Sequence, residues 1–420
     1  MNFQTAKLYI LTLLKWIALA TLCSVIVGPI GTLFVHVLEA ATHFRSTYPW
    51  LIYLLPFAGL IVVYLYRHTK LSAGGSTNAV FMAVRDNETV PSATAPLIFF
   101  STAITHLFGG SAGREGAALQ LGSSITGKIG RMLHLSDKDC RVMTLCGMSA
   151  AFAAVFGTPL TAAVFSMEVV SVGVMYYAAL VPCFLSAMIG VWIAEHLGAH
   201  PHAYPLTEFV EFSPLSAGKI ILLGILLAVL SIFVCKAFRD GSKLLSKWIP
   251  NPYIKVLAGG TAIIALTLLL GTYDYNGAGN HIIVQAIAGQ TVPYAFLLKI
   301  LFTAITLGVG YKGGEIVPVF FIGATFGCTF APLLGLPAGF GAALGMVGLF
   351  CGVTNSPLAS LLLSVELFGT QSIGLFALVC VVSYMLSGFS GLYSQQKIVY
   401  SKLGLEFIDR KVGDKESGTR

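Results

Sequence analysis

Two copies of one short acidic pattern lie 200 residues apart in this chain. Gly110-x-x-Gly113-x-Glu115 is matched by Gly310-x-x-Gly313-x-Glu315. A glycine-broken helix start that carries an acid, present once in each half, is typical of membrane transporters built from repeats. Each copy is followed by a Pro-Leu pair, a serine and a glutamate: Pro159-Leu160, Ser166 and Glu168 in the first half, Pro357-Leu358, Ser364 and Glu366 in the second.

The segment around Glu115 combines the features of an anion site and of a proton carrier. Its glycines free backbone amides to face a ligand, and the positive end of the helical run over 118–133 favours an anion. Gly113, Arg114 and Gly116 are therefore candidate anion-binding residues. The Glu115 carboxylate can occupy the same site when charged and leave it when protonated. The alternative is that Glu115 pairs with Arg114 at a membrane interface.

The second acidic turn runs from Gly308 to Pro318 and also allows two interpretations. Pro318 suits the first turn of a new helix. The amides of Ile316 and Val317 could then point from that helix start into a shared central site. Glu315 is a second acid beside an anion-binding turn, or an ordinary helix-start acid favoured by the helix dipole.

Two hydroxyl groups are further candidates. Ser76 follows a Gly-Gly pair and could donate to an anion, although a simple loop explains this turn equally well. Tyr393 ends the last apolar run and could reach the middle of the membrane or belong to an interfacial belt. Glu168 and Glu366 end short Pro-started helices, which predicts carboxylates that accept backbone N–H bonds.

Composition indicates an integral membrane protein without a large soluble domain. The 420 residues are 56% hydrophobic and 10% charged, with mean hydropathy +0.83, whereas soluble domains have about 25% charged residues. Several apolar runs are too short or too glycine-rich for a full crossing, which predicts broken helices. We expect spans near 10–39, 49–66, 92–108, 142–170, 173–195, 216–237, 256–271, 296–309, 318–350 and 373–389.

The net charge of +7 follows the positive-inside rule, because the excess lies in short loops and at the ends. We therefore expect cytoplasmic termini and no nucleic-acid partner, and a short loose tail from Glu406 to Arg420. The eight cysteines include no Cys-x-x-Cys and predict no disulfide framework. His196, His200 and His202 indicate a surface loop and not a metal site.

Several of these segments match motifs that occur together in one family. The most specific is Gly113-Arg114-Glu115-Gly116, with Ala117 where the family motif Gly-Lys/Arg-Glu-Gly-Pro has proline. The supporting matches are Gly75-Ser76 of Gly-Ser-Gly-Ile-Pro, Phe156-Gly157-Thr158-Pro159-Leu160 of Phe-Asn-x-Pro-Leu, Gly314 and Pro318 of Gly-x-Phe-x-Pro, and the late Tyr393. Over about residues 70 to 402 the chain thus resembles the CLC family of chloride channels and proton-coupled anion exchangers.

The resemblance implies an all-α integral membrane protein, a CLC-type inverted repeat of tilted and partial transmembrane helices. It also implies a homodimer with one anion path per subunit. We expect a cytoplasmic segment and first helix over 1–40, a first membrane repeat over 41–200, a second over 201–393, and a short cytoplasmic tail over 394–420 without a regulatory domain.

The resemblance also assigns roles to site residues. Glu115 corresponds to the external gating glutamate, and Ser76 and Tyr393 to the hydroxyls of the central anion site. The amides of Ile316 and Val317 complete that site.

Departures from the family pattern point to one subgroup. Val169 stands where the chloride/proton exchangers have a second, internal glutamate, and Glu315 replaces an apolar residue. With Ala117 and the short chain, these differences resemble the bacterial fluoride/proton exchangers. Ser76 is a mismatch, because that subgroup often replaces this serine.

We therefore expect a multi-pass protein of the bacterial inner membrane that exports fluoride in exchange for protons. Its partners would be fluoride or chloride, protons, the lipid bilayer and a second copy, with no cofactor or metal. A chloride channel or chloride/proton exchanger of the same family is the first alternative, favoured by Ser76 and Val169. The second is an intramembrane enzyme with Glu115 and Glu315 as an acid–base pair, but the sequence offers it no nucleophile.

Overall fold

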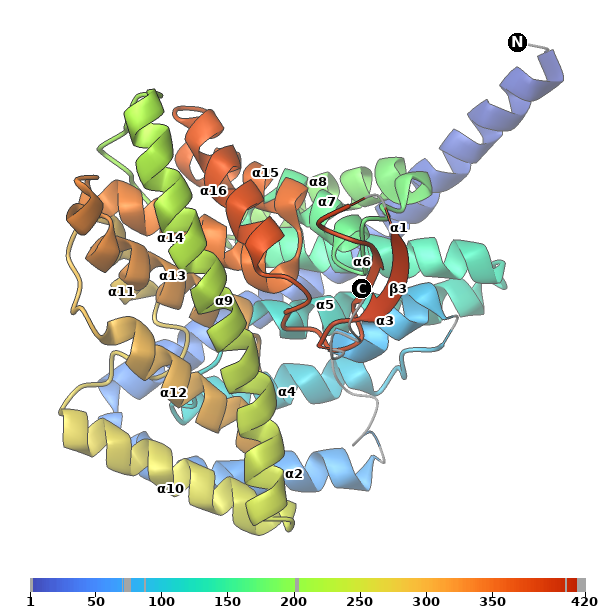
Figure 1. Ribbon diagram of the computed structural model, residues 1–420. Coiled ribbons are helices and arrows are strands. Elements are labelled where there is room, and N and C mark those ends of the chain that lie inside the picture. Colours follow the sequence, from blue (N-terminus) through green and yellow to red (C-terminus); the bar gives the residue numbers. More distant parts are fainter. Residues whose placement is uncertain are drawn as a thin grey trace.

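The computed structural model describes residues 3–69, 71, 77–86, 88–200, 204–404 and 406–413 of a predominantly helical molecule (Figure 1). Three residues singled out from the sequence, Gly75, Ser76 and His202, lie outside the described residues. The helices α1 to α16 pack into one assembly, and the N-terminal part of α1 projects from it into the surroundings.

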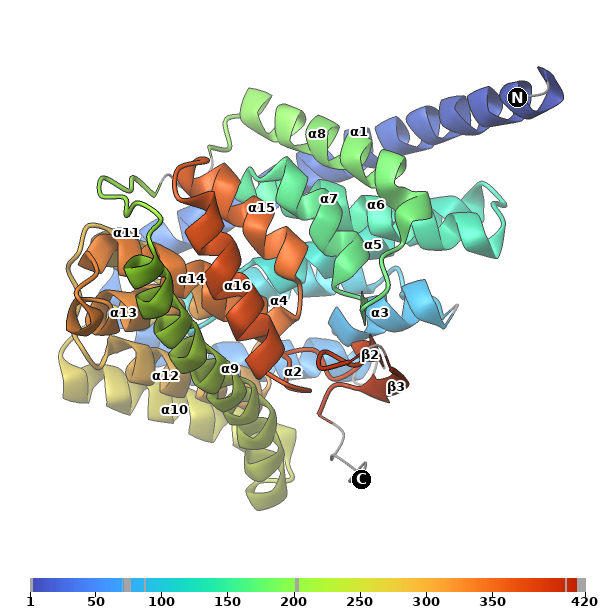
Figure 2. The same ribbon diagram turned by 45° about the horizontal axis from the view of Figure 1, so that its top comes forward.

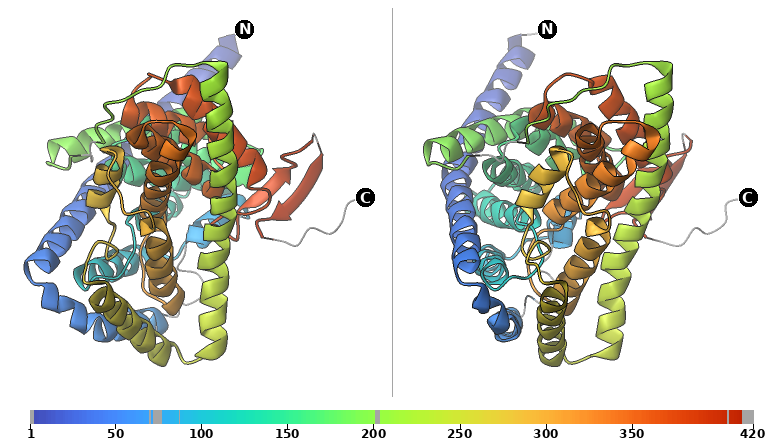
Figure 3. Two further views of the ribbon diagram at one scale, coloured as in Figure 1. Left: turned by 60° about the vertical axis from the view of Figure 1, so that its left-hand side comes forward. Right: turned by 90° about the vertical axis from the view of Figure 1, so that its left-hand side faces the viewer.

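Each half of the chain opens with its longest helix, α1 over Phe3–Thr47 and α9 over Pro214–Trp248; α9 runs along one side of the molecule (Figure 3). The first half continues with η1 Pro49–Leu54, α2 Leu55–His68, α3 Thr77–Arg85, α4 Thr94–Leu107, α5 Glu115–Met132, α6 Asp137–Phe156, α7 Pro159–Glu168, β1 Ser171–Val172, η2 Tyr177–Ala179 and α8 Leu180–His196. The second continues with α10 Pro252–Leu270, α11 Asn280–Ile287, α12 Ala295–Val309, α13 Ile316–Phe330, η3 Pro332–Leu334, α14 Ala338–Thr354, α15 Pro357–Phe368, α16 Ile373–Leu386, β2 Lys397–Tyr400 and β3 Phe407–Lys411.

The two halves pack their central helices in the same way. A Cβ added to Gly122 of α5 would meet the carbonyl of Gly147 on α6, and one added to Gly327 of α13 would meet that of Gly341 on α14. Small residues let helix backbones approach closely in a membrane, where packing replaces the hydrophobic drive between helices. Beside these pairs, α7 of the first half contacts α15 of the second (Figure 2).

The acids that end α7 and α15 hold the two halves together. Glu366 accepts hydrogen bonds from Leu160 N (2.7 Å), Thr161 N (2.8 Å) and Thr161 Oγ1 (2.6 Å) at the start of α7. Glu168 accepts in the same way from Leu358 N (3.1 Å) and from the next amide of α15 (2.9 Å). Each carboxylate thus caps the N-terminus of the helix from the other half. The predicted role of both acids as acceptors of backbone N–H bonds is confirmed.

Within the described residues, seven helical segments are long and apolar enough to cross a membrane. Large apolar side chains are exposed along the projecting part of α1, where Leu8 and Tyr9 are each 65% exposed, as expected for a surface that contacts lipid. The protein is therefore a multi-pass membrane protein. The segments are Phe3–Thr47, Pro49–His68, Asp137–Phe156, Tyr177–His196, Pro214–Trp248, Pro252–Leu270 and Ile316–Leu334.

Two of the predicted spans are wrong as single segments. The run 142–170 divides at Gly157, whose φ of 72° ends α6, and Pro159 begins α7. The run 318–350 divides after α13, where a short 3-10 turn and Gly335 (φ 66°) precede α14. A glycine in the left-handed region closes a helix and a proline starts the next, so an apolar run need not be one helix.

The loose tail expected from Glu406 to Arg420 is also wrong in part, because Phe407–Lys411 forms the strand β3. β1 pairs parallel with β2, and β2 pairs antiparallel with β3. Val172, Ile398 and Val412 are buried in a small apolar cluster at this sheet. That cluster fixes the C-terminal segment against the end of α7, despite its polar sequence.

Candidate functional site

The two acidic turns meet through a backbone bridge at the centre of the molecule. Gly113 N donates to Gly314 O (2.7 Å), and Gly314 N donates to Gly113 O (2.6 Å). A Cβ on Gly314 would lie 2.8 Å from the backbone nitrogens of both Glu115 and Gly116. Glycine at this position lets the starts of α5 and α13 approach each other.

The carboxylate of Glu115 turns back onto this bridge. Its Oε2 accepts from Arg114 N (3.0 Å) and from Val317 N (3.4 Å), so it lies at the N-terminus of α13. The side chain is fully buried, and Oε1 has no hydrogen-bond partner in the described part of the chain. Backbone amides at a helix start are the usual donors to a bound anion, and here they hold a carboxylate.

Arg114 is only a distant ionic partner of Glu115. Its Nε lies 3.9 Å from Glu115 Oε1, whereas its Nη1 lies 3.4 Å from Glu39 Oε1 and its Nη2 donates to Val155 O (3.4 Å). The contact between Arg114 and Glu115 exists, but the hydrogen bonds of the carboxylate go to backbone amides. Arg114 therefore supplies positive charge beside the site while its own donors are held elsewhere.

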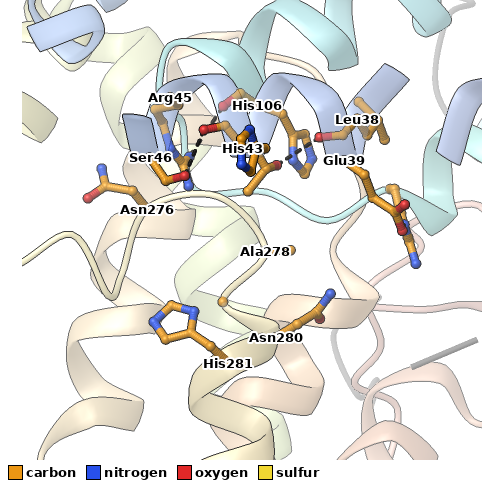
Figure 4. Close-up of a pocket in the computed structure, with 13 residues that line it drawn as sticks. Leu38, Glu39, His43, Arg45, Ser46, His106, Asn276, Ala278, Asn280 and His281 are labelled. Atoms are coloured by element: carbon orange, nitrogen blue, oxygen red, sulfur yellow. Dashed lines mark hydrogen bonds and ion pairs between the residues drawn. The ribbon is translucent and has the colours of Figure 1, made fainter. Parts of the chain in front are cut away.

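On one side of the bridge lies a cavity of about 330 Å³, which we call the Arg114 cavity (Figure 4). One wall is formed by the end of α1 with His106, and the facing wall by the segment that leads into α11. Its lining residues are Leu38, Glu39, Thr42, His43, Arg45, Ser46, His106, Arg114, Asn276, Ala278, Gly279, Asn280 and His281.

Two cations, partly buried Arg45 and fully buried Lys299, and the buried amide of Asn276 hold the walls of the Arg114 cavity in place. Arg45 Nη1 donates to His106 O (3.2 Å), and Asn276 Nδ2 donates to Gly109 O (2.8 Å). Lys299, fully buried behind the wall, donates to Gly277 O (2.7 Å). Cations that line and back a cleft raise the local concentration of anions within it.

On the other side of the bridge lies a cavity of about 220 Å³, which we call the Glu315 cavity. Glu315 is the N-cap residue of α13, and no hydrogen bond or ion pair of its side chain is found among the described residues. Tyr393 also lines this cavity and packs edge-on against Phe81, with 5.0 Å between ring centroids. The full lining is Thr77, Asn78, Ile98, Gly116, Gln120, Leu307, Tyr311, Lys312, Gly313, Gly314, Glu315, Leu392 and Tyr393.

The residues on either side of Glu115 line different cavities. Arg114 lines the first, and Gly116 lines the second. A narrow void of about 10 Å³ reaches Arg114, Glu115 and Val317 from the side of the first cavity. An ion that passed between the cavities would have to displace the Glu115 carboxylate from the Val317 amide.

The structure brings most of the predicted site residues together. Gly113, Arg114, Gly116, Glu115 and Val317 surround the bridge, and Glu315 and Tyr393 face the second cavity. Ile316 is fully buried and lines neither cavity. Ser76 lies outside the described residues, but its neighbours Thr77 and Asn78 line the Glu315 cavity.

Three polar residues that line or back the cavities were missed, and each carried a signal in the sequence. Lys312 lies inside the repeated glycine turn, and Lys299 interrupts a strongly apolar helix, although a charge is costly at both places. Gln120 lies one helical turn after Gly116, so the same face of α5 turns both toward the cavity.

A metal site receives no support within the described residues, where no cluster of three or more His, Cys, Asp and Glu side chains is found. His196 Nδ1 lies 2.8 Å from Trp192 O within its own helix, and the eight cysteines are all free thiols without a disulfide.

A buried acid held by backbone amides beside two cavities, where the two halves of a membrane-helix assembly meet, is the arrangement expected of an ion-transport protein. The sequence profile of the voltage gated chloride channel family matches residues 58–388. The chain belongs to this family, the CLC proteins.

Related proteins and solved structures cover nearly the whole chain. A chloride/fluoride channel protein of Pseudomonas syringae pv. tomato is 36% identical over 396 residues, which are 92% of this chain and 87% of that protein. The H⁺/Cl⁻ exchange transporter ClcA of Vibrio vulnificus is 24% identical, covering 90% and 88%. The crystal structure of a CLC-type fluoride/proton antiporter superposes with a TM-score of 0.88 at 31% identity, covering 91% and 98% of the two chains.

Proposed function

We propose that this protein is a proton-coupled anion antiporter that exports fluoride in exchange for protons. The observation that carries the proposal is the Glu115 carboxylate, which is held by the amide of Val317 between two cavities. An anion and this carboxylate compete for the same amides. Because protonation removes the negative charge of Glu115, it releases the carboxylate and opens the place for an anion.

Fluoride as the transported anion is supported by two similar proteins and by Glu315, the acid whose presence resembles the bacterial fluoride/proton exchangers. The relative from Pseudomonas carries fluoride in its name, and the similar crystal structure is that of a fluoride/proton antiporter. Fluoride is small, strongly hydrated and a strong hydrogen-bond acceptor, so its site must replace water with close donors. The amides of Arg114 and Val317, which now hold the Glu115 carboxylate, and the hydroxyl of Tyr393 are such donors.

The proton takes a route that does not use an acid at position 169. Val169 has an uncharged side chain and is fully buried. Its backbone carbonyl accepts a hydrogen bond from Gln396 Nε2 (2.7 Å), which is also buried. Glu315 lines the adjacent cavity and can hold a proton there. Glu115 carries the proton across the constriction, and Glu315 receives it on the other side.

The Glu315 cavity faces the cytoplasm in this proposal, and the Arg114 cavity faces outward. The C-terminal segment closes over the Glu315 cavity, because Gln395 N donates to Asn78 Oδ1 (3.0 Å) and Arg85 Nη1 donates to Gln395 O (2.6 Å). That segment and α3 carry an excess of Lys and Arg, which the positive-inside rule places in the cytoplasm.

A chloride/proton exchanger or chloride channel is the second candidate. It is supported by the Vibrio exchanger, whose name states chloride, and by the retained Ser76. An enzymatic role is not part of the proposal, because the acids lie across a constriction and the sequence offers them no nucleophile.

The functional unit in this proposal is a homodimer in the lipid bilayer. Large apolar side chains are exposed on α8 and α16, beside the α7–α15 contact: Phe184 is 36% exposed, Trp192 57% and Val381 57%. A second copy can cover this face while lipid covers the rest. The mass of the detergent-solubilised protein by light scattering tests this assembly, and a monomer would contradict it.

Anion efflux from sealed proteoliposomes tests the transport proposal. Fluoride and chloride release are measured in parallel with selective electrodes, and the external pH is recorded. The proposal requires fluoride efflux far above chloride efflux, with protons moving the opposite way. Fast chloride efflux would favour the second candidate, and proton movement would then separate exchanger from channel. No flux of either anion would contradict both.

A further inference from the structure

Lys312 is a charged residue of the second glycine turn that the transport cycle described above does not use. The turn leaves α12 through Gly310, whose φ of 120° suits glycine, and is anchored by Tyr311. The Tyr311 hydroxyl donates to Leu55 O (2.8 Å) at the start of α2. With Tyr311 fixed toward α2 and α10, the next residue lines the Glu315 cavity.

The ammonium of Lys312 is held without being neutralised. Its Nζ lies 4.4 Å from the ring centroid of Tyr66, a cation–π contact. No hydrogen bond or ion pair of this ammonium is found in the part of the chain that the structure describes. A ring face positions the charge but accepts none of its three N–H donors, which stay available to another acceptor.

Lys312 and Glu315 are the two charged side chains among the described residues that line this cavity. The titratable side chains around the pair are Tyr66 on α2, Lys255 on α10, Cys235 on α9 and the cavity residues Tyr311 and Tyr393. When Glu315 is ionised, the charges of the lining cancel. When Glu315 is protonated, the lining carries one positive charge, which belongs to Lys312.

We propose that Lys312 draws the transported anion into the Glu315 cavity and favours its presence there when Glu315 holds a proton. This inference rests on the proposed function. It adds a residue that links the occupancy of the cavity to the protonation of Glu315. An anion that enters meets the free N–H donors of Lys312 before it reaches the bridge between Gly113 and Gly314.

The test compares fluoride transport by the full-length wild type, K312Q, K312R and K243Q in proteoliposomes. Initial fluoride flux is measured against fluoride concentration at low ionic strength, and again with added potassium gluconate. Lys243 is exposed on α9, so K243Q removes a positive charge without touching the cavity. Size-exclusion chromatography of each variant checks that it is folded.

We expect K312Q to raise the half-saturating fluoride concentration roughly three- to tenfold, because a unit charge acts strongly on an ion within a cavity of low dielectric. The half-saturating concentration of K312R should stay within about twofold of the wild-type value. Added potassium gluconate should reduce the difference between K312Q and the wild type, because salt screens the charge of Lys312. K243Q should match the wild type.

A half-saturating fluoride concentration in K312Q equal to that of the wild type would overturn the inference. An equal rise of the half-saturating fluoride concentration in K312Q and K312R would also overturn it, because the shape of lysine and not its charge would then matter. A wild type that moves neither fluoride nor chloride would overturn the proposed function itself, and the inference with it.

Discussion

Glu115 Oε2 lies 3.4 Å from the backbone nitrogen of Val317, which is 202 residues further along the chain. This contact joins the acidic turn of the first repeat to the helix start of the second. It places a removable negative charge on amides that would otherwise bind an anion. In the proposed transport cycle, this contact is both the closed gate and the anion site.

Glu115→Gln should abolish proton coupling. The amide side chain cannot carry a proton, and as a neutral group it no longer competes strongly with an anion for the Val317 amide. Anion flux should persist or fall, while proton flux drops to the background of empty liposomes. Glu195→Gln is the matched control, because Glu195 is exposed on α8 and lines neither cavity. Normal proton pumping by Glu115→Gln would rule out the gate assignment.

Glu315→Gln should slow coupled fluoride transport by roughly tenfold or more, a loss typical of removing a group that transfers protons. The variant keeps the shape and the helix start, so the backbone bridge at Gly314 should survive. Paired fluoride and proton recordings provide the measurement. Glu208, exposed in the loop before α9, offers a control as Glu208→Gln. If Glu315→Gln transports both ions like the wild type, then Glu315 is only a helix-start acid.

Gly314→Ala should inactivate transport because the new Cβ would lie 2.8 Å from the nitrogens of Glu115 and Gly116. The bridge must then widen, which moves the carboxylate away from Val317. Gly218→Ala is the control: a Cβ at Gly218 on α9 meets nothing within 4 Å, and alanine favours a helix over glycine by about 0.5–1 kcal/mol. Flux and thermal stability of both variants are compared. Full activity in Gly314→Ala would mean that the close approach is not required.

Local sequence patterns anticipated the site better than they anticipated the helices. The repeated Gly-x-x-Gly-x-Glu pattern pointed to the two turns that meet in the structure, although Gly314, which forms the bridge with Gly113, is not one of its glycines. The apolar runs 142–170 and 318–350 hid helix breaks, since hydropathy does not register a left-handed glycine such as Gly157. Lys312 was missed because its importance depends on a cavity formed by segments far apart in the sequence.

The strand over Phe407–Lys411 is a second case in which local sequence did not predict the structure. Its sequence is polar, and it is ordered by pairing with β2 and by burial of neighbouring apolar residues such as Ile398 and Val412. β2 in turn pairs with β1, which follows α7 in the first half of the chain, and local composition cannot identify so distant a partner.

Glu366→Ala should destabilise the protein more than Glu168→Ala. Glu366 accepts three hydrogen bonds at the start of α7, all between 2.6 and 2.8 Å, whereas Glu168 accepts two longer ones at the start of α15. Hydrogen bonds to a charged group contribute about 1.5–3 kcal/mol each, so the loss at α7 should dominate. The midpoint of thermal unfolding in detergent, followed by intrinsic fluorescence, ranks the variants.

The control for this pair is Glu211→Ala, which removes an exposed acid of the loop before α9 and should leave the unfolding midpoint unchanged. Glu366→Gln should recover part of the loss, because its amide oxygen still accepts from one backbone amide but lacks the second acceptor and the charge. Since each acid caps a helix of the other half, the double variant should lose less than the sum of the single effects, as expected for residues of one coupled contact. Strictly additive effects would instead mean that the two caps stabilise α7 and α15 independently, and that they do not form one connection between the repeats.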